Sequence, residues 1–344
     1  MRAGKHAGKP CYAPGCWLER EDAKNVGVEK PSAVEDDLAD LISEIAQTDG
    51  DYATPVPELM VYRRSAATDP MPCILGMGLG MAVRGEKRVT LGTDIYDFKP
   101  GQTLVTSVDL PVVTYVTRAT PEQPYLGLWL QLDARVIGQV AATMDFPTPA
   151  TTGSSLGMTV ATPDAGLRRA LIQLLRLLRE PALVPLVGPL VQQEIAVRLL
   201  TGEHGPTLRR LVMAGSPSQQ IARVIAWLKQ HFTKNFPMDD LATQAHMSPS
   251  TFRQHFREVA GMSPLQYLKQ LRLQEARRLM VETMLDAGSA GHQVGYESPS
   301  QFSREYARQF GAPPLRDAGR TRRSLLDRPS REPDRLSPEM LSEG

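Results

Sequence analysis

The sequence predicts a multidomain α+β protein, in which a small β-barrel with a pair of helices precedes an all-α domain that holds two helix-turn-helix units. Three observations support this prediction. The 344 residues suit two domains of ordinary size, residues 60–132 are rich in short β-forming runs, and the basic C-terminal third contains an internal repeat.

The composition excludes several classes of protein. Apolar residues make up 42% of the chain and charged residues 22%, which excludes a collagen, a pure coiled coil or a wholly disordered chain. Cys11, Cys16 and Cys73 cannot all pair, and none has a histidine at zinc-finger spacing, so a disulfide scaffold or a structural zinc site is not expected. Because we find no export signal and no apolar run long enough to cross a bilayer, we expect a cytoplasmic protein with no membrane partner.

Residues 1–50 are expected to be a flexible N-terminus that contains one short helix. The first 30 residues mix Gly, Pro and Lys without periodicity. After Ser32, apolar residues recur at helical spacing and predict an amphipathic helix from Val34 to Gln47. Its apolar positions are Leu38, Leu41, Ile42 and Ile45.

Residues 51–160 form the predicted β-domain. Runs such as QTLVTSV, VVTYVTR and YLGLWLQL alternate with turn residues, a spacing typical of a small barrel or a jelly roll. Enzymes built on such barrels usually bind a metal through histidines, yet none of the six histidines lies in this region. We therefore expect no metal, no cofactor and no catalytic residue.

Residues 161–213 are predicted to be a helical segment for connection and dimerisation. Thr162 and Pro163 suit the N-cap and the first position of one helix, and a second helix is predicted from Pro189 to Leu200. The first helix has a leucine face that covers the barrel or forms a dimer interface, alone or in addition. This face comprises Leu167, Leu171, Leu174, Leu175 and Leu178.

Charge is distributed unevenly along a chain whose net charge is only +1. Residues 206–323 hold 17 Lys and Arg against 9 Asp and Glu, a net charge of +8, so the remainder sums to −7. Such asymmetry is typical of a polyanion-binding module joined to a domain with another role, although a basic face can also serve solubility alone. The stretch AGSPS at 214–218 predicts a linker before this module.

The basic region contains two copies of one pattern. SPSTFRQHFREVAGMSP, which starts at Ser248, aligns with SPSQFSREYARQFGAPP, which starts at Ser298, at an offset of 50 residues. In each copy Ser caps a helix, Pro is its first residue, aromatic residues four apart face the core, and Gly ends it. LATQAHM and AGHQVGY upstream suit a short preceding helix and align at an offset of 49, so each copy predicts a helix-turn-helix unit, and the second turn has one extra residue, Glu297.

In a helix-turn-helix unit the second helix enters the major groove of DNA. The residues predicted to contact base edges are Ser250, Arg253, Gln254, Ser300, Gln301 and Arg304. Arginine suits O6 and N7 of guanine, and glutamine suits N6 and N7 of adenine. The residues predicted to contact phosphates are Arg257, Arg308, Ser248 and Ser298. For each of them, a solvated surface position is the alternative.

A longer helix is predicted between the copies, from Ser263-Pro264 to about Met280, and it would hold the two units at a fixed separation. Its apolar residues are Leu265, Leu268, Leu271, Leu279 and Met280, and the basic residues expected outside are Lys269, Arg272, Arg277 and Arg278.

The motifs SPLQYLKQLRLQEARRLM and VGYESPSQFSREYARQFGAPP resemble the AraC/XylS family of bacterial transcription regulators. VYRRSA, GEKRVTLG, TSVDLP and PEQPYLGLWLQLD resemble the family's N-terminal domain of cupin fold, and RLLTGEHGPTLRRL resembles its connecting segment. The likeness covers residues 55–323. One departure is Ala290-Gly291, where the family commonly has Ile-Ala. Each Gly lowers helix propensity by about 1 kcal/mol, which predicts a softer second unit.

The resemblance implies a cupin-like effector domain over 51–160, a double helix-turn-helix DNA-binding domain over 214–323 and a flexible tail over 324–344. It implies a sequence-specific transcription regulator, typically an effector-responsive activator, that is not an enzyme. Its expected partners are double-stranded DNA, a small-molecule effector, RNA polymerase and a second copy, and its expected place is the nucleoid. The alternatives are a cupin-type metalloenzyme with a DNA-binding tail, which the missing histidines disfavour, and a sequence-neutral architectural protein, which Arg and Gln at the base-contacting positions disfavour.

Overall fold

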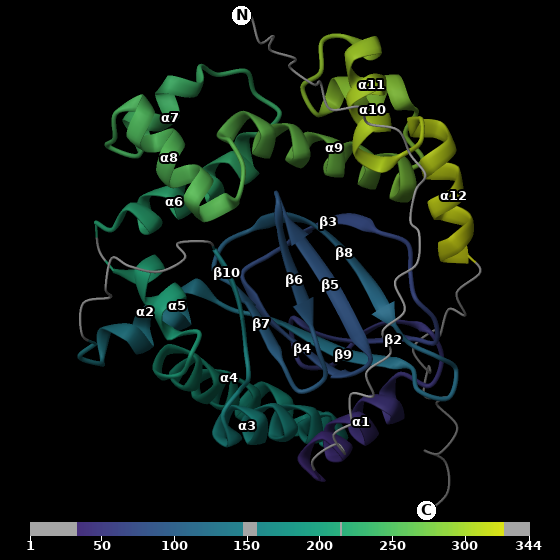
Figure 1. The fold of residues 1–344 in the computed structure, drawn as a ribbon, viewed down its shortest axis with the longest axis vertical. Helices are drawn as coiled ribbons and strands as arrows, with labels where there is room; N and C mark the ends of the chain where they lie inside the picture. The colour runs from purple at the N-terminus through teal and green to yellow at the C-terminus, as the bar shows by residue number, and fades with distance from the viewer. Residues whose placement is uncertain (1–32, 147–156, 214, 327–344) are drawn as a thin grey trace, which may run out of the picture.

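A computed structural model describes residues 33–146, 157–213 and 215–326 (Figure 1). It has a sheet-rich N-terminal part and a helical C-terminal part, as the α+β prediction requires. The flexibility predicted for residues 1–30 and for the tail beyond residue 326 lies outside the described residues.

Ten strands of the described chain form two antiparallel sheets. The six-stranded sheet consists, in spatial order, of β1 (Gly50–Ala53), β2 (Leu59–Arg64), β9 (Tyr125–Gln131), β4 (Gly78–Arg84), β7 (Thr103–Thr106) and β10 (Met158–Ala161). The four-stranded sheet consists of β3 (Met71–Leu75), β8 (Leu110–Arg118), β5 (Glu86–Leu91) and β6 (Asp94–Phe98). Buried residues from both sheets belong to one apolar cluster, so the sheets pack against each other.

Alternating residues of the six-stranded sheet face opposite sides, as a pleated strand requires. In β9, Leu126, Leu128 and Leu130 face a layer of helices, whereas Tyr125 and Trp129 face the other sheet. The covering helices are α1 (Ala33–Ile45), α3 (Ala165–Arg176) and α4 (Val184–Thr201). The bounds of α1 are close to those of the helix predicted over 34–47.

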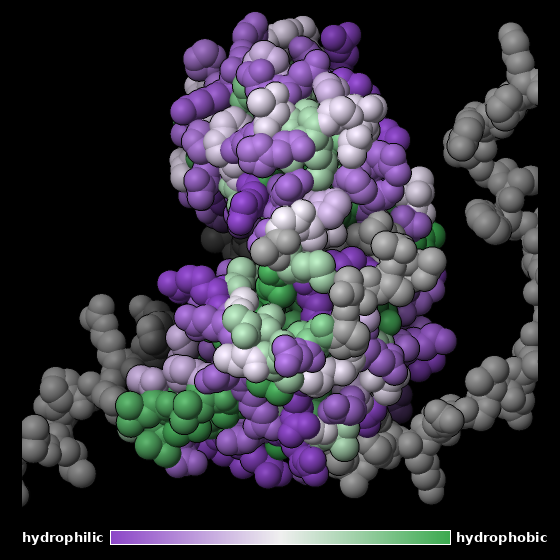
Figure 2. Space-filling model, turned by 90° about the vertical axis from the view of Figure 1, so that its left-hand side faces the viewer, coloured by the Kyte–Doolittle hydropathy of each residue, from purple (hydrophilic) through white to green (hydrophobic). Residues whose placement is uncertain are grey.

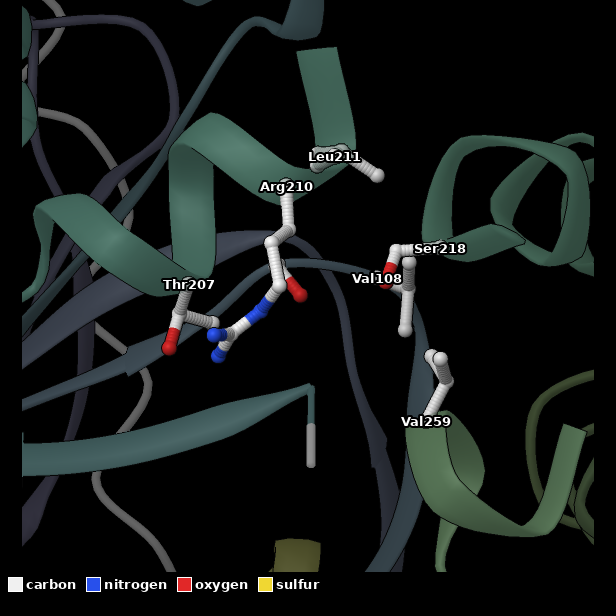
Figure 3. A pocket seen from close by; sticks show the side chains of 7 residues that line it. Val108, Thr207, Arg210, Leu211, Ser218 and Val259 are labelled. Atoms are coloured by element: carbon white, nitrogen blue, oxygen red, sulfur yellow. The ribbon is translucent and has the colours of Figure 1, made fainter. Parts of the chain in front are cut away.

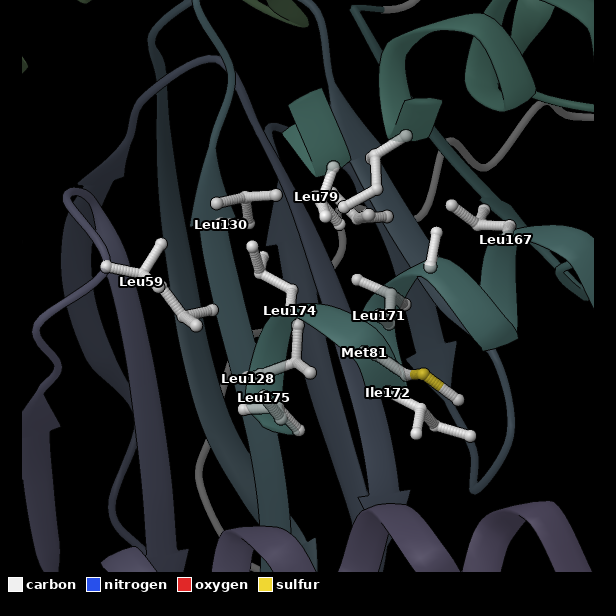
Figure 4. Close-up of a cluster of buried hydrophobic side chains, with 14 of the residues drawn as sticks. Leu59, Leu79, Met81, Leu128, Leu130, Leu167, Leu171, Ile172, Leu174 and Leu175 are labelled. Carbon is white, nitrogen blue, oxygen red and sulfur yellow. The ribbon is translucent and has the colours of Figure 1, made fainter. Parts of the chain in front are cut away.

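The leucine face of α3 covers the sheet, which was the first of the two predicted alternatives. Leu167, Leu171, Leu174 and Leu175 are buried among Leu79, Met81, Leu128 and Leu130 of the strands (Figure 4). These four leucines are buried inside one protomer and Leu178 is half-buried, and the dimer predicted through this helix stays a prediction.

Two helix boundaries in this segment differ from the prediction. The N-cap of α3 is Asp164, whose carboxylate accepts a hydrogen bond from the Leu167 amide at 2.6 Å, so Thr162 and Pro163 precede the helix. The second helix begins at Val184 and not at 189, because Pro189 is accommodated inside it at the loss of one backbone hydrogen bond.

One helix of the described chain, running through the 3₁₀ turn η2 (Pro181–Leu183) and α4 to Thr201, is long and apolar enough to cross a membrane. From the sequence no apolar run of that length is expected, and this helix reaches it by length and composition. Val191 and Ile195 on its inner face belong to the apolar cluster of the β-domain, and its last turns carry an Arg198–Glu194 ion pair at 2.9 Å. One face of this helix therefore packs in the core of the β-domain, and the other face is exposed.

The remaining helices are α2, which lies between β9 and β10, and a series of helices that follows α4. Their bounds are α2 (Ala134–Ala142), α5 (Gly205–Val212), α6 (Pro217–His231), α7 (Met238–Gln244), α8 (Pro249–Ala260), α9 (Pro264–Glu282), α10 (Ala287–Gln293), α11 (Pro299–Phe310) and α12 (Pro314–Leu326). The predicted linker at 214–218 is shorter than expected, since Ser216 already caps α6 by accepting from the Gln219 amide. In Figure 1, α9 crosses above the ends of the strands, and it contacts β3 and β8.

Candidate nucleic-acid interface

The first helix-turn-helix unit consists of α7 and α8. Ser248 caps α8 by accepting from the Thr251 amide at 3.3 Å, Pro249 is the first helical residue, and Gly261 ends the helix with φ of 69°. Only a residue without Cβ adopts that left-handed conformation without strain, which explains the Gly at this position. The predicted pattern of Ser, Pro and Gly therefore sets the two ends of this helix.

The second unit, α10 and α11, repeats these contacts. Ser298 accepts from the Gln301 amide at 3.3 Å, Pro299 follows, and Gly311 ends α11 with φ of 73°. Asp286 caps α10 by accepting from the amides of Gly288 and Ser289 at 2.9 and 3.0 Å. Both predicted helix-turn-helix units are thus present.

The turns repeat as well, at the predicted offset of 49. The Met247 amide donates to Ala242 O at 2.9 Å, and the Tyr296 amide donates to Gly291 O at the same distance. The first turn has His246 with φ of 52° where the second has Gly295 with φ of 93°. A Cβ at Gly295 would lie 2.6 Å from the Thr233 carbonyl, so here glycine is required.

The extra residue of the second turn has a role in packing. α7 and α8 are separated by residues 245–248, whereas α10 and α11 are separated by 294–298. The carboxylate of the inserted Glu297 accepts a hydrogen bond from the side-chain nitrogen Nδ2 of Asn235 at 2.9 Å. This bond joins the second turn to the segment after α6.

Aromatic cores fix the orientation of the second helix of each unit, α8 or α11, which we call the recognition helix. The rings of Phe252 and Phe256 lie 5.6 Å apart at 63°, and the rings of Phe302 and Tyr306 have the same separation and angle. Gly291 serves this packing, because a Cβ there would lie 3.0 Å from the Phe302 ring. The glycine that lowers helix propensity in α10 therefore also makes room for the second core.

All residues predicted to contact base edges are exposed on one of the two recognition helices. Ser250, Arg253 and Gln254 lie in the first half of α8, and Ser300, Gln301 and Arg304 lie in the first half of α11. Of the residues predicted to contact phosphate, Arg257 and Arg308 are exposed further along the same helices. Ser248 and Ser298 sit at the helix N-termini with their hydroxyls engaged as caps.

Several of these side chains have weak intramolecular partners. Arg253 pairs with Asp239 at 3.0 Å, Gln254 donates to Glu258 at 3.0 Å, and Gln301 donates to Glu305 at 3.3 Å. Exposed pairs of this kind contribute about 0 to 1 kcal/mol, so a nucleic acid can displace them. Among the described residues, Arg304 has no hydrogen-bonding or ionic partner.

α9 connects the two units through arginines that the sequence predicts to lie on its solvent-facing side. Arg272 donates to the carbonyls of Phe232, Gly295 and Lys234 at 2.7, 3.0 and 2.9 Å, which joins the end of α6 to the second turn. Arg272 was predicted to face solvent, and this is wrong because three backbone acceptors converge on it. Leu265, predicted to be apolar core, is instead 50% exposed.

Arg277 was also predicted to be outside, and it is instead part of a buried network. Its Nε donates at 2.8 Å to Asp317 of α12, whose carboxylate also accepts from the Tyr306 hydroxyl at 2.9 Å. Asp317 is 1% exposed, and Arg277 stacks over the Phe310 ring at 4.9 Å. No sequence signal pointed to this contact, because its partners lie 40 residues apart.

A second network positions α11 against α9. Glu305 accepts from Lys269 Nζ at 2.6 Å and from the Tyr296 hydroxyl at 2.8 Å. Burial alone would raise the pKa of Glu305, but these hydrogen bonds hold that pKa below its ordinary value, so the carboxylate stays ionised.

The C-terminal end of α8 and the start of α9 contact the β-domain. The Gly157 amide donates to the Val259 carbonyl at 2.8 Å, and the Tyr267 hydroxyl donates to the Asp109 carbonyl at 2.9 Å. Lys229 of α6 pairs with the Asp109 carboxylate at 3.0 Å. The contact leaves the first half of α8, with its predicted base-contacting residues, exposed.

A small pocket lies where the β-domain, α5, α6 and α8 meet (Figure 3). It is lined by Ser107, Val108, Thr207, Arg210, Leu211, Ser218 and Val259. Beside it, a groove of about 430 Å³ runs between α2, α5, α6 and the segment after β7. The connecting helix α5 therefore contacts the β-domain and the first helix-turn-helix unit at one place.

In residues 33–146, 157–213 and 215–326, no group of three or more His, Cys, Asp or Glu side chains suits a metal ion. His204, the histidine nearest the sheets, bridges Thr103 Oγ1 and Thr159 Oγ1 at 2.8 and 2.7 Å. Burial lowers its pKa to about 4. This is the environment of a neutral structural histidine.

Comparison with known proteins covers both domains. A model of the AraC-type transcriptional regulator N-terminus matches residues 55–207, and a helix-turn-helix domain model matches residues 241–319. The chain is 40% identical over 77 residues to the RCS-specific HTH-type transcriptional activator RclR of Escherichia coli, which is 22% of this chain and 27% of RclR. It is 29% identical over 136 residues to a putative AraC-like transcription regulator of Streptomyces lividans, 38% of this chain and 45% of that protein.

The chain spans less than half the length of these curated relatives. Among solved structures, the DNA-binding domain of AdpA in complex with a target DNA has 30% sequence identity, covers 30% of this chain and 95% of that one, and has a TM-score of 0.30. The two family models together match the β-domain and the paired helix-turn-helix units, and the chain belongs to the AraC-type transcriptional regulators.

Proposed function

We propose that this protein is a sequence-specific DNA-binding transcription regulator, not an enzyme, whose β-domain responds to a small effector. The observation that carries the proposal is the repeated geometry of two capped recognition helices, each with exposed Arg and Gln or Ser at its N-terminal half. Arg and Gln suit bidentate hydrogen bonds to base edges in the major groove.

In this proposal each side chain has a stated role. Arg253 and Arg304 bind guanine, and Gln254 and Gln301 bind adenine, with Ser250 and Ser300 beside them. Arg257 and Arg308 bind phosphates, and the helix N-termini at Ser248 and Ser298 add backbone amides toward the phosphate chain. The net charge of +8 over residues 206–323 supplies the sequence-independent attraction.

We infer that the junction of the two domains transmits the state of the β-domain. α5 and the loop at Asp109 contact both parts, so a shift of the sheets would move α6, α8 and α9 together. RclR is named an activator, and by analogy this chain would contact RNA polymerase and activate transcription on the nucleoid.

We also propose a homodimer, formed through α4 and not through α3. A hydrophobic patch is visible at the lower left of Figure 2, at the end of the molecule that carries α3 and α4. Leu186 and Leu190 of α4 are 70% and 65% exposed and lie one helical turn apart, next to Leu183. Leu183 lines a groove with Arg176 and Asp37, which pair with each other, so residues of both charges lie beside this surface and a two-fold axis can match opposite charges.

The experiment that tests the proposed function is a selection of genomic fragments bound by the purified protein, followed by competition with random DNA. The proposal predicts one recurrent sequence with two short blocks, one for each recognition helix, and retention of that sequence under an excess of random competitor. Enrichment without a recurrent sequence would indicate an architectural protein instead.

A further inference from the structure

One lysine side chain of the β-domain lies between the two sheets. Lys87 belongs to β5 of the four-stranded sheet, and its Nζ lies 5.5 Å from the ring centre of Tyr62, which belongs to β2 of the six-stranded sheet. It precedes Val89 and Leu91 on the inner face of β5, so its stem continues an apolar row. An ammonium at this place is partly removed from water.

Lys87 differs from the other basic residues nearby in having no counter-charge. Arg64 is paired with Asp51, Arg88 with Asp97 and Arg118 with Glu86. Within the described chain, no carboxylate lies within ion-pair distance of Lys87. Burial lowers its pKa, which shows that the site disfavours an unpaired cation.

The charged groups that act on Lys87, Arg64 and Asp51, are paired with each other, and the thiol of Cys73 and the hydroxyl of Tyr62 beside Lys87 are neutral at pH 7. Burial raises the pKa of the Cys73 thiol to about 11, and burial together with the Asp51 charge raises the pKa of the Tyr62 hydroxyl to about 12. They offer hydrogen bonds and no negative charge. The positive charge of Lys87 is therefore uncompensated, and this surface can accommodate an anion.

A second observation points to a ligand at the same place. Thr114 of β8 is 6% exposed, and its Oγ1 is buried with no hydrogen-bond partner among the described residues. Thr114 pairs with Val89, and Lys87 pairs with Val116, so Lys87 and Thr114 are diagonal neighbours on the inner face, a geometry in which the backbones lie about 7–8 Å apart. A buried hydroxyl left unbonded costs about 1 to 3 kcal/mol unless something satisfies it.

The opposite wall of the site is aromatic. A Cβ at Gly78 would lie 2.4 Å from the Trp129 ring, and one at Gly80 would lie 3.1 Å from it, so these glycines of β4 let the indole lie flat on the sheet. Gly127 does the same for the Tyr125 ring. Tyr62 and Trp129 remain only partly buried, so their faces are available to an apolar group.

We propose that the space between the two sheets binds a small organic carboxylate, with its anionic head on Lys87 and Thr114 and its apolar body against Tyr62 and Trp129. The proposal names the chemical class of the effector, and it rests on the proposed function of the β-domain. An ion pair with the ammonium would supply the missing counter-charge, and a carboxylate oxygen would accept the hydrogen bond of the Thr114 hydroxyl.

Isothermal titration of the full chain with matched pairs of probes tests the proposal. Benzoate is compared with benzamide, and hexanoate with hexanamide, since each pair differs in charge and hardly in shape. We expect saturable binding of at least one carboxylate, at least tenfold tighter than its amide. Equal affinity for acid and amide, or no saturable binding of either acid up to millimolar concentration, would overturn the proposal without any variant.

Variants then assign the site. Lys87→Met should weaken carboxylate binding at least tenfold and should leave the thermal midpoint of the unliganded protein unchanged or higher, because it removes an unpaired cation. Thr114→Val should weaken binding severalfold. The matched control is Lys99→Met, an exposed lysine of the same domain, which should bind as the wild type does. Undiminished binding by Lys87→Met would place the ligand elsewhere.

The same variant separates this proposal from the proposed function. Lys87 lies away from the recognition helices, so Lys87→Met without carboxylate should keep the affinity of the wild type for the selected DNA sequence. Lost carboxylate selectivity with intact DNA binding would overturn only the effector class. A wild-type protein without sequence preference would overturn the proposed function and leave the carboxylate site testable.

Discussion

The hydroxyl of Tyr267, at the start of α9, donates a hydrogen bond of 2.9 Å to the backbone carbonyl of Asp109 in the β-domain. The Tyr267 ring also packs edge-on against Phe256 of α8, at a centroid distance of 5.5 Å. One side chain therefore belongs both to the core of the first helix-turn-helix unit and to the junction between the domains. The Tyr267 ring therefore links Asp109 to the recognition helix, beside the Lys229–Asp109 ion pair and the hydrogen bond from Gly157 to Val259.

Tyr267→Phe should lower the free energy of unfolding by about 1 to 2 kcal/mol, because the partly buried Asp109 carbonyl loses its donor while the aromatic packing stays. Urea unfolding followed by tryptophan fluorescence measures this. Tyr96→Phe is the control, since the Tyr96 hydroxyl has no hydrogen bond to another described residue, and it should stay within about 0.5 kcal/mol of the wild type. If both variants behave alike, the hydroxyl does not stabilise the junction.

Asp317→Ala should destabilise the second unit by about 3 to 5 kcal/mol, because Arg277 would remain half-buried without its counter-charge and the Tyr306 hydroxyl would lose its acceptor. Thermal unfolding followed by circular dichroism gives the comparison. Asp239→Ala removes an aspartate from an exposed pair with Arg253 and should cost less than about 1 kcal/mol. Similar losses in the two variants would contradict a structural role for the buried network.

His204 should make stability depend on pH. Burial lowers its pKa to about 4 in the folded chain, against about 6.5 in the unfolded chain, so below pH 6.5 the unfolded chain binds a proton that the folded chain does not. The neutral imidazole's contribution is complete above pH 6.5 and declines as pH falls toward 4, by about 3 kcal/mol in total. Denaturant unfolding of the wild type and of His204→Gln at several pH values isolates this slope. Parallel curves for the two proteins would show that His204 does not titrate on unfolding.

Leu186→Glu together with Leu190→Glu should give a folded monomer, because both side chains are exposed in one protomer and would be buried only by a second copy. Light scattering with circular dichroism checks both statements. Leu315→Glu, a substitution at an equally exposed leucine of α12, should leave the dimer intact. A wild type that is already monomeric at micromolar concentration would refute the proposed dimer.

Local signals account for what the sequence predicted well. Ser, Pro and Gly at the ends of α8 and α11 act through contacts within four residues. The helix ends that they set can therefore be predicted without knowledge of the fold. The offset of 49 in the turns matches the repeated hydrogen bonds, and the extra residue Glu297 lies where the alignment put it.

Contacts distant in sequence account for the errors. Arg272 and Arg277 look like solvent-facing positions of an amphipathic helix, and only the arrival of Gly295 and Asp317 from later segments makes them interior. Asp164, and not Thr162, caps α3, because its carboxylate accepts from the Leu167 amide. The inward direction of Lys87 could not be read either, because it depends on strand register.

The measurement that tests the central claim most directly is the affinity of Arg253→Ala and Arg304→Ala for the selected sequence and for random DNA at one salt concentration. Each substitution removes one bidentate contact to a base, so each should lose about 1 to 3 kcal/mol on the selected sequence, relax the preference at a different base position, and change random binding little. Equal losses on selected and random DNA would mean that these arginines bind phosphate only, and would contradict base recognition by the two helices.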